Sequence, residues 1–115
     1  MEILKKNERL DDLQFENLFL IQNKNEYCFT SDSVELANFV KCKKDGTIVD
    51  LCSGSGVIGI LALKKTNAKK AILVEVQQHL ADMANRSVEY NKLQNEVQVV
   101  NEPLQNVYKK IGANF

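Results

Sequence analysis

The sequence predicts an α/β protein in which three parallel strands alternate with helices in a doubly wound arrangement. From residue 47 onward, short runs rich in β-branched residues alternate with longer segments that have helical periodicity. A glycine-rich turn, Ser53-Gly54-Ser55-Gly56, joins the first of these strands to the helix that follows it. The chain has 115 residues, of which 44% are hydrophobic, so one core can form without disulfides.

The composition excludes several classes of protein. The 15 basic and 15 acidic residues balance, which argues against a polycation that binds nucleic acid by bulk charge alone. Cys28, Cys42 and Cys52 are odd in number and form no Cys-x-x-Cys pair, so we expect reduced thiols in a cytoplasmic protein and no metal site. No run of 18 apolar residues is present, so we expect no membrane contact.

Residues 1–30 are predicted to form an N-terminal arm and short hairpins, separate from the rest. The first 12 residues are polar and charged, as expected of an arm. Short apolar runs at 13–15, 18–21 and 27–29 are separated by turn-forming residues and predict short strands.

Residues 31–115 are predicted to form the main domain, which begins with a helix. Asp32 and Glu35 have the spacing of a capping box, and an acid suits the positive end of the helix dipole. Val34, Ala37 and Val40 recur on one face of this helix, which is predicted to end before Gly46.

The remainder alternates strands with helices. Buried strands are predicted at 47–51, 70–75 and 97–100, because each run is short, apolar and β-branched. Apolar residues at helical spacing predict a helix from Val57 to about residue 63. Leu80, Met83, Ala84 and Val88 predict a second helix, which ends near Asn91. A last helix is possible at 104–110. This order of elements favours a parallel sheet with right-handed crossovers.

Two acids and two glycines mark the candidate site. Asp50 lies at the tip of the first strand, and Glu75 ends the second, 21 positions after Gly54. Ligands of open parallel sheets bind at the carboxyl ends of the strands, where both acids are expected. Gly54 and Gly56 would let a ligand approach the backbone, and the carboxylate of Glu75 could accept hydrogen bonds from both hydroxyls of a ribose.

The pattern admits two cofactors. Gly54-x-Gly56-x-x-Gly59 with an acid about 20 residues later satisfies the dinucleotide fingerprint and would suit NAD. Asp50, however, lies within the tight turn, where its charge suits the ammonium group of S-adenosylmethionine better than a pyrophosphate. Gly59 is then a position of close packing between helix and sheet. The alternative without a ligand is that the glycines only form a tight turn.

Three other features carry no functional assignment from the residues alone. Cys52 is expected to be a small buried residue of the loop and not a reactive thiol, and His79 has no predicted partner. Lysine pairs at 5–6, 43–44, 64–65, 69–70 and 109–110 are typical of a solvated surface, with a patch that faces RNA as the alternative.

Three segments together resemble the bacterial tRNA1(Val) (adenine-N6)-methyltransferases. They are Glu8 to Gln14, Tyr27 to Phe39 and the loop around Asp50. The resemblance covers nearly the whole chain. It implies the Rossmann-type methyltransferase fold, S-adenosylmethionine as cofactor, and methylation of an adenine next to the anticodon of valine tRNA.

The resemblance also implies roles for the residues of the loop. Asp50, Gly54 and Gly56 would line the methionine side of the cofactor, and Glu75 would hold its ribose. Cys52 stands where the family has its first loop glycine, and Ser53 follows it in the same loop.

Two further positions match the family outside this loop. Asn101-Glu102 stands where the family has Gly-Asp, so Glu102 would bind the adenine of the cofactor. Ser31 and Asp32 match a motif that lies near the cofactor pocket.

The catalytic motif of that family is absent from this sequence. Such enzymes carry Asn-Pro-Pro-Tyr after a fourth strand, whereas this chain has one proline, Pro103. We therefore expect the cofactor-binding half of a methyltransferase, truncated before the fourth strand and inactive alone. The strand that carries Asp50 would lie at an edge of the sheet, which invites self-association. A non-catalytic nucleotide-binding module and an NAD-binding dehydrogenase-type domain are the alternatives.

Overall fold

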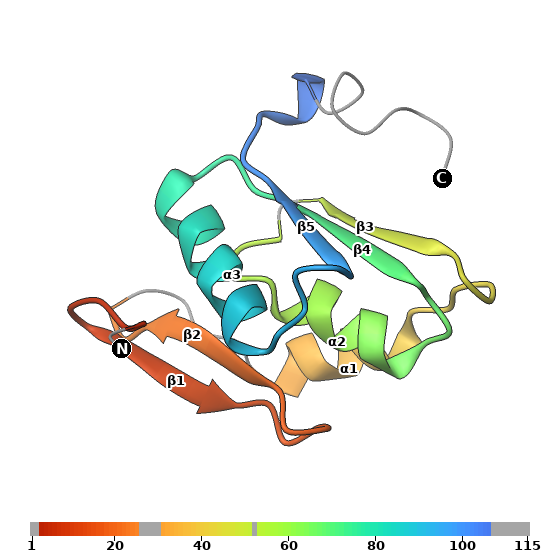
Figure 1. The fold of residues 1–115 in the computed structure, drawn as a ribbon, viewed down its shortest axis with the longest axis horizontal. Helices are drawn as coiled ribbons and strands as arrows, with labels where there is room; N and C mark the ends of the chain where they lie inside the picture. The colour runs from red at the N-terminus through yellow and green to blue at the C-terminus, as the bar shows by residue number, and fades with distance from the viewer. Residues whose placement is uncertain (1–2, 26–30, 52, 107–115) are drawn as a thin grey trace.

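A three-stranded parallel sheet and a two-stranded antiparallel hairpin form the framework of the molecule (Figure 1). The structure, a computed structural model, describes residues 3–25, 31–51 and 53–106. The elements in chain order are β1 (Glu8–Asp12), β2 (Phe19–Asn23), α1 (Ser31–Phe39), β3 (Thr47–Leu51), α2 (Val57–Lys65), β4 (Lys70–Val74), α3 (Gln78–Tyr90), β5 (Val97–Val100) and a 3-10 turn, η1 (Leu104–Asn106).

The parallel sheet has the strand order β3-β4-β5, which confirms the predicted α/β fold. Thr47 is in register with Lys70, and Ala71 is in register with Val97. The central strand β4 is buried from Ala71 to Val74, as the apolar run predicts. β3 lies at an edge and is only half buried from residue 47 to residue 50, because no strand of the described chain covers its outer side.

The helix α2 begins at its predicted residue, and both α2 and α3 end close to their predicted limits. α2 follows β3 and is nearly all apolar, and six of its nine residues are buried. α3 is amphipathic and buries one face, which includes Met83, Ala84 and Val88 as the spacing predicts. The predicted last helix is described only as the short 3-10 turn η1, and the rest of 104–110 lies outside the described residues.

The helix α1 begins at Ser31, two residues earlier than an N-cap at Asp32 predicts. Asp32 therefore lies in the first turn and is not the N-cap residue, although its charge still suits that end of the helix dipole. Ala37 is 1% exposed and Val34 packs against the main core, whereas Val40 lies beyond the end of the helix.

The N-terminal hairpin differs from its prediction. The first strand is β1, inside the predicted arm, and the strand predicted at 13–15 is wrong. Gln14, Glu16 and Asn17 have φ of 56°, 49° and 57°, so this segment turns tightly instead of extending. β2 begins and ends slightly later than the predicted strand at 18–21, and the strand predicted at 27–29 lies outside the described residues.

Side chains of α3 and of its C-cap residue, Asn91, hold the outer edge of β2. The backbone N–H of Ile21 donates to Ser87 Oγ at 2.9 Å, and that of Phe19 donates to Asn91 Oδ1 at 2.9 Å. Asn91 Nδ2 donates in return to the carbonyl of Phe19 at 2.6 Å. Ser87 of α3 and the C-cap residue Asn91 therefore satisfy backbone groups that an edge strand would leave without a partner.

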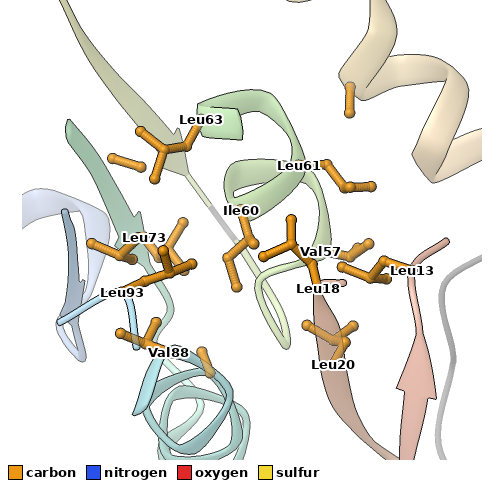
Figure 2. Packing of buried hydrophobic residues seen from close by; sticks show 14 residues of the cluster. Leu13, Leu18, Leu20, Val57, Ile60, Leu61, Leu63, Leu73, Val88 and Leu93 are labelled. Carbon is orange, nitrogen blue, oxygen red and sulfur yellow. The ribbon is translucent and has the colours of Figure 1, made fainter. Parts of the chain in front are cut away.

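A single hydrophobic cluster joins the hairpin, α2 and the sheet. Figure 2 shows Leu13, Leu18 and Leu20 on one side of α2, and Leu73, Val88 and Leu93 on the other. Leu20, Ile60, Leu61 and Leu73 are each 0% exposed. The hairpin therefore contributes to the main core and is no detached arm, and the boundary at residue 30 stays a prediction. None of the helices described is long and apolar enough to cross a membrane.

Candidate functional site

Glu75 follows the last residue of β4 and turns its carboxylate toward the glycine loop. Its Oε1 accepts a hydrogen bond from the Gly54 N–H at 2.8 Å, and its Oε2 accepts one from the Gln77 N–H at 2.9 Å. The residue is only 5% exposed. The glycine loop and the end of β4 are thus tied together through one buried carboxylate, as the chain order predicts.

Asp50 lies on β3 and reaches the start of α2. Its Oδ2 accepts a hydrogen bond from the Gly59 N–H at 3.1 Å. The N-cap residue of α2 is Gly56, which has no side chain to offer, so Asp50 supplies an acceptor for the first turn of the helix. Within the described residues, its other oxygen, Oδ1, accepts no hydrogen bond and remains available to a ligand.

The pKa of the Asp50 carboxyl is raised to about 6. Burial is the main cause, the hydrogen bond from the Gly59 N–H opposes it, and the negative charge of Glu75 contributes to the increase. Among the described residues, neither carboxylate forms an ion pair with a lysine or arginine. Two neighbouring acids without a cation are expensive for a fold, and such an arrangement is typical of a site that binds a positive group.

The three glycines have different roles. Gly54 has φ of 59°, and a Cβ there would meet no atom within 4 Å, so space is open above the loop. Gly56 has φ of 100°, where glycine is strongly favoured. At Gly59 a Cβ would overlap the Leu73 side chain and lie 3.1 Å from Asp50 Oδ2, which confirms that this glycine serves close packing of helix and sheet.

The hydroxyl of Ser53 supports the presence of a ligand site. Ser53 is 8% exposed, and its Oγ is buried with no hydrogen-bond partner among the described residues. A buried hydroxyl without a partner is unfavourable in a finished structure. Its neighbour in the predicted site, Cys52, lies outside the described residues.

Asn101 is a residue of the site to which the sequence reasoning gave no role of its own. Its Nδ2 donates to the carbonyls of Glu75 and Val76, at 2.9 Å and 3.0 Å. These bonds fix the backbone on which Glu75 is mounted. The only signal in the sequence is an asparagine directly after the third strand, a position shared with many turns.

Three other predicted site residues, Ser31, Asp32 and Glu102, lie outside the glycine loop and the strand ends described above. Glu102 is half buried just beyond β5. Asp32 is exposed in the first turn of α1, a helix that packs against α2. The structure places Ser31 as the first residue of α1. The roles of these three residues toward a cofactor stay predictions.

Apolar surface lies beside the carboxylates. Leu51 and Val76 follow Asp50 and Glu75 in sequence and are 54% and 59% exposed. The carboxyl end of the sheet thus offers a carboxylate for a cation and a carboxylate for hydroxyls. It also offers accessible backbone at Gly54 and apolar side chains for a flat ring. In the described parts of the chain, no group of three or more His, Cys, Asp or Glu is placed to hold a metal ion.

Residues 31–114 match the family described as methyltransferase small domain. The chain belongs to this family. This methyltransferase small domain is 33% identical over 86 residues to a release factor glutamine methyltransferase of Mycoplasma mycoides subsp. mycoides SC. The match covers 75% of this chain and 30% of that protein, so the chain spans less than a third of this relative.

Solved structures share the fold of this methyltransferase small domain. TYW2 of P. horikoshii in complex with MeSAdo aligns with a TM-score of 0.71 at 15% identity, over 89% of this chain and 38% of that one. TrmK of M. capricolum in complex with S-adenosyl-homocysteine aligns with 0.64 at 17%, over 77% and 39%. The complex of aTrm5 and tRNALeu aligns with 0.66 at 16%, over 86% and 29%.

Membership in this family implies S-adenosylmethionine as the cofactor, and the residues present fit it. The unpartnered Oγ of Ser53, the open space at Gly54 and the unpaired acids Asp50 and Glu75 are the observations that fit. The NAD alternative loses support, because the family matched is one of methyltransferases.

Proposed function

We propose that this chain is the cofactor-binding half of an S-adenosylmethionine-dependent methyltransferase that methylates adenine N6 in tRNA. The observation that carries the cofactor site is the Glu75 carboxylate, buried and bonded to the Gly54 N–H at the carboxyl end of the sheet. In this proposal residues 31–115 are the first half of a Rossmann-type domain.

Each residue of the proposed site has a stated task. Glu75 accepts hydrogen bonds from the ribose hydroxyls while it keeps its bonds to the loop. Asp50 Oδ1 faces the ammonium of the cofactor, and Gly54 lets the cofactor lie against the backbone. When bound, S-adenosylmethionine supplies the sulfonium methyl group that is transferred. The chain itself contributes positioning and electrostatics.

The choice of adenine in valine tRNA rests on the N-terminal segments, Glu8 to Gln14 and Tyr27 to Phe39, which resemble the tRNA1(Val) enzymes. The alternative substrate is a glutamine side chain of a release factor, which the Mycoplasma mycoides relative supports. Both acceptors are nitrogen atoms that carry hydrogen, so the same cofactor site serves either reaction.

Calorimetric titration of the 115-residue chain with S-adenosylhomocysteine and with NAD tests the cofactor site. We expect binding of S-adenosylhomocysteine only. Glu75→Ala should weaken it by about 10- to 150-fold, or roughly 1.5–3 kcal/mol, because the ribose loses its acceptor. Glu89→Ala, at an exposed residue of α3, is the matched control and should leave binding unchanged. Binding of NAD alone, or a loss below threefold in Glu75→Ala, would contradict the proposal.

Transfer of a radiolabelled methyl group tests the activity. We expect no incorporation into valine tRNA by the 115-residue chain, because the Asn-Pro-Pro-Tyr motif is absent from it. Fusion of this chain to the remaining length of a tRNA1(Val) enzyme should give incorporation into tRNA. Incorporation into a release factor by an equivalent fusion, with none into tRNA, would instead favour the glutamine substrate.

The free edge of β3 is proposed to make the isolated chain self-associate. Its outer side is unpaired by the described residues, and Leu51 at its end is 54% exposed. Light scattering should show a mass that rises with concentration. A monomer at all concentrations would overturn this part of the proposal.

A further inference from the structure

The end of the sheet opposite the candidate cofactor site is strongly basic. The segments 40–46, 64–70 and 91–96 lead into β3, β4 and β5, so they meet at the amino ends of the parallel strands. These segments hold eight of the 15 basic residues of the chain but only two of its 15 acids, Asp45 and Glu96. A protein with zero net charge therefore concentrates positive charge at one end.

Backbone hydrogen bonds hold the three segments side by side. The Asp45 N–H donates to the carbonyl of Asn67, and the Lys69 N–H donates to that of Gly46, both at 2.8 Å. The Ala71 N–H donates to the carbonyl of Glu96 at 2.9 Å. The segments before β3 and β4 appear together in Figure 1, at the end of the sheet away from the β4–α3 turn.

Most of these lysines have no partner among the residues that the structure describes. Lys64 pairs with Glu96 at 3.0 Å, and Lys65 donates to Asn38. The other six are exposed and form no ion pair or hydrogen bond through their side chains with the described residues. We call this group the lysine surface: Lys41, Lys43, Lys44, Lys69, Lys70 and Lys92.

Aromatic rings and amides accompany the lysines. Phe39 is 75% exposed and Tyr90 is 43% exposed, and each lies two positions before a lysine of the surface. Asn67, Gln94 and Asn95 are exposed in the same segments. Lysines bind phosphates, aromatic rings stack on bases, and amides bond to sugars and bases, so the combination suits RNA. A membrane would favour a single amphipathic helix instead of three loops.

We propose that the lysine surface binds the phosphate backbone of the RNA substrate, at the end of the sheet opposite the cofactor site. This inference deepens the proposed action on RNA and rests on it for the choice of partner. The five-residue strands separate the two ends of the sheet by about 17 Å. A folded RNA can span that distance, so one molecule can contact the lysine surface while its target base lies near the cofactor.

Fluorescence anisotropy with a labelled, unmodified valine tRNA transcript tests the proposal. The double variant Lys43→Gln/Lys69→Gln removes two charges from two segments of the surface. We expect its affinity at low salt to fall about three- to tenfold, and the slope of log Kd against log salt to decrease by about 1–2, since each phosphate contact contributes about 0.9. Lys6→Gln/Lys24→Gln removes two exposed lysines of the hairpin region and should weaken binding less than twofold.

Two further readouts separate this proposal from the other assignments. Affinity for S-adenosylhomocysteine should be unchanged in both double variants. This measurement reports on the cofactor site separately from RNA binding, so the failure of one proposal can be told from the failure of the other. Equal weakening by the two double variants would overturn the proposal. Retention by phosphatidylserine vesicles without binding to the transcript would also overturn it, in favour of a membrane surface.

Discussion

Two regions of this molecule bury carboxylates, and they treat them in opposite ways. Near the N-terminus, Arg86 on α3 forms a bidentate pair with Glu8 on β1, with N–O distances of 2.5 Å and 2.8 Å. This bonding holds the pKa of Glu8 below its usual range. At the carboxyl end of the sheet, burial raises the pKa of Asp50 to about 6, and the described structure offers this group no cation.

The difference indicates that the Glu8 carboxylate serves the fold, whereas Asp50 and Glu75 are available to a ligand. The Glu8 carboxylate finds its cation within the protein, because Arg86 bonds to both of its oxygens. Arg86 is held in place in turn by bonds to Asp82 and to the carbonyl of Ile3. The pair fixes the hairpin to α3, beside the contacts of Ser87 and Asn91 with β2. Among the described residues, Asp50 and Glu75 accept hydrogen bonds only from backbone N–H groups, so their negative charge is left for a ligand.

The largest effect is expected where the paired carboxylate loses its cation. Arg86→Ala leaves the Glu8 carboxylate with no cation and with only the Lys5 N–H as a donor, so the free energy of unfolding should fall by about 3–5 kcal/mol, as measured by urea denaturation. Glu8→Leu/Arg86→Met removes both charges and should recover most of that loss. A loss below 1 kcal/mol in Arg86→Ala would show that the Glu8–Arg86 pair contributes little to holding the hairpin.

A smaller effect is expected at Asp50, where removal of the charge should raise the free energy of unfolding instead of lowering it. Because the folded pKa of Asp50 lies above its ordinary value of 3.8, the folded chain binds more protons than the unfolded chain between about pH 4 and pH 6. The free energy of unfolding therefore decreases as pH rises through this window, and the full penalty is present above it. A shift from 3.8 to about 6 corresponds to about 3 kcal/mol, which partial exposure reduces to about 2 kcal/mol.

Asp50→Asn tests that sign directly. At pH 7.5 the variant should be about 2 kcal/mol more stable than the parent chain, and near pH 4 the two should be equal. Its affinity for S-adenosylhomocysteine should fall at the same time, because the ammonium loses its counter-charge. Equal stability of the two chains at pH 7.5 would mean that the charge of Asp50 does not destabilise the folded chain.

The smallest effect is expected at Gly54, which separates the cofactor role of the loop from its structural role. Gly54→Ala keeps open space around the new methyl group but forces alanine to φ of 59°, so stability should fall by about 1 kcal/mol. Cofactor affinity should fall by more than tenfold, because the methyl group occupies the space proposed for the ligand. Thermal unfolding and calorimetry on one preparation give both values, and unchanged affinity would exclude ligand contact at Gly54.

The sequence predicts the parallel sheet and its helices well for a physical reason. β3, β4 and β5 are apolar runs, and α2 and α3 repeat apolar residues at helical spacing, so local pattern and burial agree. β1 was missed because its sequence, Glu-Arg-Leu-Asp-Asp, is mostly charged and is held by pairing with β2 and by Arg86. The apolar segment 13–15 predicted a strand, but left-handed residues around it make a turn.

The candidate site shows the same division. The approach of Asp50 and Glu75 to the loop follows from chain order, since parallel strands end at one edge of a sheet. The bonds from Asn101 to Glu75 and from Gly59 to Asp50 link residues 26 and 9 positions apart, and neither leaves a periodic signal in the sequence. Such contacts are decided by tertiary packing, which a single sequence does not display.

The central claim is that the carboxyl ends of β3 and β4 hold S-adenosylmethionine. The most direct test is an NMR titration of the 15N-labelled chain with S-adenosylhomocysteine, which follows each backbone amide. We predict the largest shifts at Gly54, Gly56 and Gln77, and none at the Glu8–Arg86 pair. Shifts confined to the hairpin and the first turn of α3, or an unchanged spectrum at saturating ligand, would contradict the account.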